Sequence, residues 1–310
     1  MNKIRQFFWL TSMLALMLTT TVGCGGGDQN NGQNGNAGNS GNTGNTGNTG
    51  NTNPTPIPSG PKEATDITFT IDMLQQGYSK VIGTIGSTNF MVDSMMPQPG
   101  GVIHFKQDTA LNSGLYFLVT PDNKAIQFLL DVDQTFTMTT SAIDIVKQMK
   151  VVGSKDNELL YENLKWEQDF QNRFKPVSEQ LAATPDANPD KARLEHQQRE
   201  LLQSRLDHIA SFKTNHPNTF FTTYKLAGQN PKLEEPKRTD GTLDTDLQIY
   251  IYRNAYWNNT PLSDERLLHT PIIFNKLKTY ITQLTPQNID SVKKYANIVV
   301  KKSQSNREMF

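Results

Sequence analysis

The sequence contains a single cysteine, Cys24, among its 310 residues. A lone cysteine excludes an intrachain disulfide, a CxxC redox pair and a cysteine-ligated zinc within this chain. Basic and acidic residues number 30 each, so the chain lacks the basic excess with which nucleic-acid binders neutralise phosphates. No apolar run reaches the ~18 residues that indicate a membrane-spanning helix. We therefore expect no disulfide chemistry within the chain and no nucleic-acid partner.

The motifs of common enzyme classes are missing as well. The sequence has no GxSxG nucleophile elbow, no P-loop and no GxGxxG loop after a strand-like segment. Its five histidines have no metal-ligand spacing such as HExxH. His196 and Glu200 lie four residues apart, which is more typical of a solvated helix face than of a metal pair. We assign no catalytic residue, no cofactor and no metal ligand, and the sequence favours a non-enzymatic role.

The N-terminus has the three zones of a secretory signal peptide. Lys3 and Arg5 give a positive start, an apolar stretch runs from Phe7 to about Leu18, and small residues continue to Gly23. The apolar stretch has the length of a signal core, roughly 7–15 residues, and is too short to span a bilayer. The pattern predicts a cleaved signal peptide that ends directly before the cysteine.

The four residues from Thr21 to Cys24 resemble a lipobox, the recognition site of the lipoprotein signal peptidase. Thr21 stands where that motif prefers leucine. The resemblance implies a diacylglycerol on Cys24, and two or more acyl chains anchor a protein stably to a membrane. Gly25 replaces the aspartate that retains such proteins in the inner membrane, which implies the outer membrane. Surface export of such lipoproteins in some Gram-negative groups uses an acidic cluster just after the cysteine. Here only Asp28 is acidic, which favours the periplasmic face over the cell surface.

Residues 24–62 form a low-complexity linker rich in Gly, Asn and Thr, with a short GNT repeat. They lack the apolar side chains that offset the entropy lost on ordering, so we expect a disordered tether. A flexible chain of this length has an end-to-end distance of roughly 35 Å. The linker is therefore predicted to hold the folded part clear of the lipid surface.

From residue 63 to residue 153 the apolar residues follow a period of two. In the segment ITFTIDM, four apolar residues alternate with polar ones, as in a half-buried strand: Ile67, Phe69, Ile71 and Met73. Further strand-like runs are separated by turn residues: KVIGTIG, NFMVDSMM, GVIHFKQ, GLYFLVT, AIQFLLDV, TFTMTT and KQMKVVG. Short strands at this spacing predict an all-β sandwich or an open barrel.

After these strands the period of the apolar residues changes to 3.6. Trp166, Phe170 and Phe174 lie at i, i+4 and i+8, on one face of a predicted helix, and several further helices follow. The expected fold class is therefore α+β with two domains. A β-domain at 63–153 precedes an all-α helical domain at 154–310.

Two helices near the C-terminus have apolar positions that predict their buried faces. In the first, at about 243–257, we expect Leu247 and Ile251 to point inward. In the last, which follows Thr285, we expect Ile289 and Val292 to do so.

The first of these helices also carries an aromatic group that allows two interpretations. Tyr250, Tyr256 and Trp257 can stack on a sugar ring as ligand contacts, or they can belong to the core. Their helical offsets favour the core. Further along, Asp264 and Arg266 are close enough to form a charge-assisted contact.

Three stretches together resemble the N-terminal module of thioredoxin-like lipoproteins of Gram-negative bacteria. They are GVIHFKQDTALNSGLYFLVTPDNKAIQFLLDVDQTFTM in the β-domain, VVGSKDNELLYENLKW from Val151 to Trp166, and YWNNTPLSDERLLHTPIIFNKLKTYI from Tyr256 to Ile281. In that family a small β-domain and a helical domain of unknown function precede a thioredoxin domain with a CxxC motif. No cysteine after Cys24 can take the role of that motif here.

The resemblance implies a function for the folded part. The leading hypothesis is a membrane-anchored, non-catalytic binding scaffold for a thioredoxin-type partner or another envelope protein. The first alternative is the N-terminal part of a periplasmic thiol-disulfide oxidoreductase whose CxxC domain lies beyond residue 310. A glycan-binding surface lipoprotein is the second alternative, and it rests on the aromatic group alone.

Overall fold

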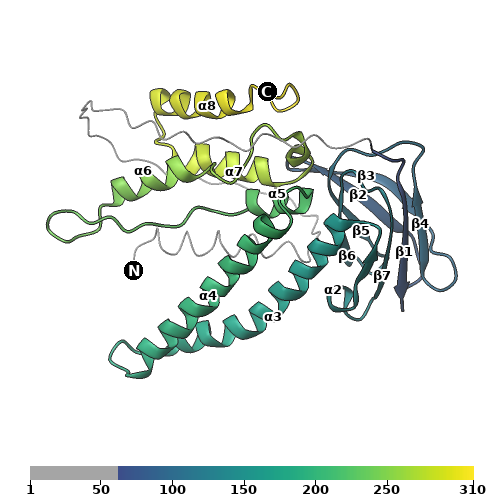
Figure 1. Ribbon diagram of the computed structural model, residues 1–310, viewed down its shortest axis with the longest axis horizontal. Coiled ribbons are helices and arrows are strands. Elements are labelled where there is room, and N and C mark those ends of the chain that lie inside the picture. Colours follow the sequence, from purple (N-terminus) through teal and green to yellow (C-terminus); the bar gives the residue numbers. More distant parts are fainter. Residues whose placement is uncertain (1–61) are drawn as a thin grey trace, which may run out of the picture. The chain divides into compact units, whose positions relative to one another are not determined.

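The computed structural model describes residues 62–310, which lie within one compact unit. Its first part consists mainly of strands and its second part of helices, so the predicted α+β fold class is confirmed (Figure 1). The last strand ends at Val152 and the first long helix begins at Lys155, which is where the period of the sequence changes. The predicted signal peptide and nearly all of the predicted linker lie outside the described residues.

The strands form two four-stranded sheets, in the orders β4-β1-β7-β8 and β3-β2-β5-β6. Neighbouring strands are antiparallel except for β1 and β7, which run parallel with Ile67 opposite Phe136. The strands are β1 (Asp66–Asp72), β2 (Ser79–Ile85), β3 (Thr88–Met95), β4 (Val102–Lys106), β5 (Gly114–Val119), β6 (Ala125–Leu130), β7 (Thr135–Ser141) and β8 (Lys150–Val152).

The helices follow the strands with one exception. They are α2 (Ile145–Gln148), α3 (Lys155–Ala183), α4 (Asp190–Asn215), α5 (Phe220–Ala227), α6 (Thr245–Ala255), the 3-10 helix η1 (Glu265–His269), α7 (Ile272–Thr279), the π-helical segment η2 (Tyr280–Leu284) and α8 (Ile289–Ser303). The exception is α2, whose last two residues overlap the start of KQMKVVG, a segment that the sequence predicts as a strand. The Asp144 side chain caps it by accepting a hydrogen bond from the Lys147 amide. None of the described helices is both long and apolar enough to cross a membrane.

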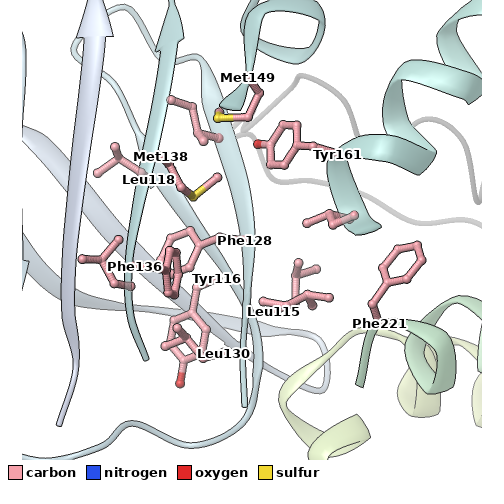
Figure 2. Packing of buried hydrophobic residues seen from close by; sticks show 14 of the residues in the cluster. Leu115, Tyr116, Leu118, Phe128, Leu130, Phe136, Met138, Met149, Tyr161 and Phe221 are labelled. Atoms are coloured by element: carbon pink, nitrogen blue, oxygen red, sulfur yellow. The ribbon is translucent and has the colours of Figure 1, made fainter. Parts of the chain in front are cut away.

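Aromatic side chains fill the space between the two sheets. Phe128 on β6 lies 5.4 Å from Phe69 on β1 and 6.5 Å from Phe136 on β7, measured between ring centroids. Tyr116 on the neighbouring strand β5 stacks on Phe128 at 5.8 Å (Figure 2). These rings carry the alternation that the sequence predicts, and the two sheets form a sandwich around them. The prediction is wrong for Met73, which follows the end of β1 and is 67% exposed.

The first two turns of α3 close the free edge of β6. The side-chain oxygen of Asn157 accepts a hydrogen bond from the Leu129 amide at 2.7 Å, and its nitrogen donates to the Leu129 carbonyl at 2.8 Å. One turn later, the Tyr161 hydroxyl donates to the Gln127 carbonyl at 3.0 Å. Because β6 is the last strand of its sheet, these backbone groups have no neighbouring strand to pair with. The helix takes the place of that strand.

The outer face of β5 and β6 is covered by helices. Leu115 and Leu129 are opposite one another on these strands, on the face away from Tyr116 and Phe128. They belong to one buried cluster that extends to Tyr161 on α3 and Phe221 on α5 (Figure 2). The hydrophobic core therefore crosses the boundary between the β-part and the helical part of the chain.

Beyond this core, α3 and α4 run side by side as a long hairpin (Figure 1).

In the C-terminal helices the predicted inward orientation of Leu247 and Ile289 is wrong, because Leu247 is 42% exposed and Ile289 is 86% exposed. Ile289 is the first residue of α8, and the buried face of that helix is centred on Tyr295 instead. Val292 is only half-buried.

Candidate functional site

The residues that the sequence singled out are not brought together at one exposed site. Cys24 lies outside the described residues. Tyr250 is 54% exposed on α6, whereas Tyr256 is 3% and Trp257 only 2% exposed. The prediction that these rings belong to the core is therefore right for Tyr256 and Trp257 and wrong for Tyr250, whose side of α6 faces solvent.

Tyr256 and Trp257 belong to an aromatic cluster with the rings of η2 and α8. Tyr280 stacks on Tyr256 at 5.7 Å and meets Trp257 edge-on at 5.3 Å. Tyr295 of α8 in turn packs edge-on against Tyr280 at 6.0 Å. The cluster holds three segments of the helical part together, which is the core role that the helical offsets predicted for Trp257.

A buried lysine lies beside this cluster, and no local sequence pattern predicts it. The Nζ atom of Lys276 on α7 donates to the carbonyls of Ala227 at 3.2 Å and Gln229 at 3.0 Å. It also lies 4.8 Å from the centre of the Tyr256 ring. Burial lowers the pKa of Lys276 to about 7. The lysine thus supplies donors to carbonyls left over at the C-terminal end of α5.

A buried ion cluster lies where η1 meets the sheets. The Arg266 guanidinium donates to Asp264 through Nε at 2.9 Å and through Nη2 at 2.6 Å. This contact confirms the predicted pairing of the two residues. The Nη1 atom of Arg266 donates at 2.8 Å to Asp131, which directly follows β6. Asp131 also accepts a hydrogen bond from Ser113 at 2.6 Å. Local spacing could not predict the Asp131 contact, because the partners are 135 residues apart.

Close approach of η1 to β5 depends on Gly114. A Cβ atom at this position would collide with the side chain and carbonyl of His269. Two backbone segments can approach this closely only where one of them has no side chain. Gly114 therefore lets the ion cluster form directly against the sheet.

Asp156 at the start of α3 adds a second carboxylate to this junction. It is buried, and its Oδ1 accepts a hydrogen bond from the Phe221 amide at 2.7 Å. Burial raises the pKa of Asp156 to about 6, and the negative charge of Asp131 adds to the rise. The Phe221 amide and Arg266 oppose this rise without cancelling it.

A second ion cluster lies between α3, α4 and α5. The Glu167 carboxylate on α3 binds Arg205 of α4 and Lys225 of α5, each at 2.9 Å. Burial alone would raise the pKa of Glu167, but the two cations outweigh burial and lower it. Next to this cluster, His208 stacks on Trp166 at 4.1 Å between ring centres, and burial lowers the pKa of His208 to about 4.

These arrangements are suited to holding the fold together. All three nitrogen positions of the Arg266 guanidinium already donate to carboxylates, and both Glu167 oxygens accept from cations. Such closed networks leave few groups to receive a substrate. Within residues 62–310 no group of three or more His, Cys, Asp or Glu side chains is placed to hold a metal ion. Comparisons of the chain with protein-family models, curated proteins and solved structures found no match.

The raised pKa of Asp156 predicts a pH-dependent stability that an isosteric change removes. The folded-state pKa lies above the unfolded value, so its stabilising effect is full below pH ~4 and is lost as the pH rises through ~6. Asp156→Asn keeps the acceptor for the Phe221 amide and never becomes charged. Urea unfolding at several pH values should show the variant gaining up to about 2–3 kcal/mol over the wild type between pH ~4 and ~7. A constant difference across this range would contradict the assignment.

The burial of Trp257 predicts that its truncation damages stability before any binding function. Trp257→Ala should lower the free energy of unfolding by about 3–5 kcal/mol, because it removes a buried ring that packs against Tyr256 and Tyr280. The matched control is Tyr250→Ala on the exposed face of α6, which should change stability by about 0.5 kcal/mol or less. Thermal unfolding measures both variants. If Trp257→Ala unfolds like the wild type but loses binding to a glycan, the ring is a ligand contact.

Proposed function

We propose that this chain is a lipid-anchored protein of the cell envelope whose folded part acts as a non-catalytic binding scaffold. The observation that carries the proposal is the position of the only cysteine, directly after a signal-like segment and within a lipobox-like sequence. Lipidation of Cys24 would place the protein at a membrane, and the absence of aspartate at Gly25 favours the outer membrane. The periplasmic face suits a partner of the thioredoxin type or another envelope protein.

Buried ion pairs that join separate elements of the described residues support a scaffold role. Arg266 joins η1 to the end of β6, and Glu167 joins α3 to α4 and α5. Breaking a buried ion pair typically costs about 3–5 kcal/mol, because one charge is left buried without a partner. These contacts therefore oppose rearrangement of the elements they join. A partner would meet a preformed surface, which lowers the entropic cost of binding.

The glycan-binding alternative has less support. Stacking on a sugar needs aromatic faces that water can reach, and Tyr256 and Trp257 are almost fully buried. Tyr250 is the one exposed ring of the three. A single exposed tyrosine on a helix is common on protein surfaces and does not by itself indicate a binding site.

The lipid anchor is tested by replacing the cysteine in cells. Cys24→Ser should abolish incorporation of labelled palmitate and move the protein from the membrane fraction to the soluble fraction. Gly25→Ala is the matched control, because it changes the adjacent residue and keeps the lipidated thiol. Gly25→Asp should remain membrane-bound but move to the inner membrane.

Two results would count against this proposal. Palmitate incorporation in Cys24→Ser would show that the lipid is attached elsewhere. A Gly25→Ala variant that is released like Cys24→Ser would show that the neighbouring sequence, and not the thiol, decides the location.

A further inference from the structure

The last helix, α8, has an exposed face that combines lysines with apolar side chains. Its buried residues are Tyr295 and Ser303. Lys293, Lys294 and Lys301 are exposed. Among the apolar residues of this helix, Ile289 is 86% exposed and Val300 is 41% exposed. We call Ile289, Lys293, Lys294, Val300 and Lys301 together the α8 face.

Helix geometry places the members of the α8 face side by side. At about 100° per residue, Ile289, Lys293 and Val300 project within about 40° of one another, and the other two lysines follow at about 120–140°. The exposed Asp290 projects at about 100°, so the three lysines outnumber one carboxylate on this side of the helix. Tyr295 projects on the opposite side. There its hydroxyl accepts a hydrogen bond from Arg253 Nη1 at 2.6 Å, and its ring packs against Tyr280. The contacts that hold α8 therefore leave the α8 face uncovered within the described residues.

Positive charge is concentrated in this part of the chain. From Ile289 to Phe310 the basic residues are Lys293, Lys294, Lys301, Lys302 and Arg307, and the acidic residues are Asp290 and Glu308. Five basic minus two acidic residues give a net charge of +3, whereas the whole chain is neutral.

None of these five basic side chains takes part in an ion pair with any residue from 62 to 310. Some exposed lysines elsewhere do so, among them Lys106 with Asp66 and Lys155 with Glu158. The net positive charge at the C-terminal end of the chain is therefore not paired with carboxylates of the described residues, although Lys294 Nζ lies 5.5 Å from the centre of the Tyr295 ring. It is available to an anionic partner.

We propose that the α8 face docks onto the anionic phospholipid headgroups of a bilayer. Lysines beside a membrane are attracted to anionic lipids, while neighbouring apolar side chains enter the boundary between headgroups and acyl chains. Ile289 and Val300 fit that boundary, as does Phe310, which is 73% exposed. A nucleic acid would use the lysines but would leave these apolar side chains in water.

The inference rests on the proposed anchoring through Cys24, which would keep the folded part near the bilayer at a high effective concentration. A weak electrostatic contact is then sufficient to set the orientation of the folded part. The lipid anchor would hold the protein at the membrane, and the α8 face would decide which side of the fold turns toward it.

Vesicle binding without the lipid anchor tests the α8 face separately. The probe is the chain from residue 24 to 310 with Cys24→Ser. It is floated with vesicles of phosphatidylcholine alone or with about 30% phosphatidylglycerol, at salt concentrations of about 0.05 and 0.5 M. We expect binding only to the anionic vesicles and loss of binding at high salt. Combined Lys293→Gln, Lys294→Gln and Lys301→Gln should weaken binding about a hundredfold, at about fivefold for each lysine.

The matched control removes three exposed lysines from other elements, with Lys80→Gln, Lys147→Gln and Lys213→Gln. This control should bind within about threefold of the parent, since the charge is lost on β2, α2 and α4 and not on α8. Ile289→Ser should weaken binding without changing the salt dependence. Circular dichroism confirms that each variant is folded.

Equal losses in the two triple variants would overturn the inference, because net charge alone would then explain binding. Equal binding to neutral vesicles, or binding to an oligonucleotide in place of vesicles, would overturn it too. Failure of palmitate labelling in cells would remove the proposed anchor but leave the vesicle result standing. The two proposals can therefore fail independently.

Discussion

The pairing of the Asn157 side chain with the backbone of Leu129 is the constraint on which the rest of the arrangement depends. A sandwich with an open edge at β6 would leave amide and carbonyl groups without partners, and such edges recruit other chains. One amide side chain satisfies both groups of Leu129. It also fixes the start of α3 against the sheet. The apolar residues that follow on α3 are then placed over the outer face of β5 and β6.

The buried charged groups lie in the same region and also hold the helices against the sheets. Asp131 follows directly on β6, Asp156 lies in the first turn of α3, and Arg266 comes from η1 far along the chain. Each charged group is expensive to bury alone and is tolerated here because partners from other elements meet it. The charges therefore specify how the helices sit on the sheets more than they add to stability.

Much of the fold could be predicted from the sequence, because strands and helices have different apolar periods. The boundary after residue 153 and the core role of Trp257 follow from that pattern. The contacts of Asp131 with Arg266 could not be predicted, since nothing local links residues so far apart. The predicted burial of Ile289 is wrong because periodicity shows which residues are apolar but not whether a neighbouring element covers them. Lys276 has the sequence context of a surface lysine, and its burial depends on tertiary packing alone.

The most direct test of this account is the free energy of unfolding of Asn157→Ala against Asn172→Ala, measured by urea titration and circular dichroism. Both changes remove an asparagine from α3, but Asn172 is exposed to solvent. The account predicts a loss of about 2–4 kcal/mol for Asn157→Ala, because two buried backbone groups lose their partner, in one transition for strands and helices together. Asn172→Ala should stay within about 0.5 kcal/mol of the wild type. Equal effects of the two changes, or separate transitions with only the helical one affected, would contradict it.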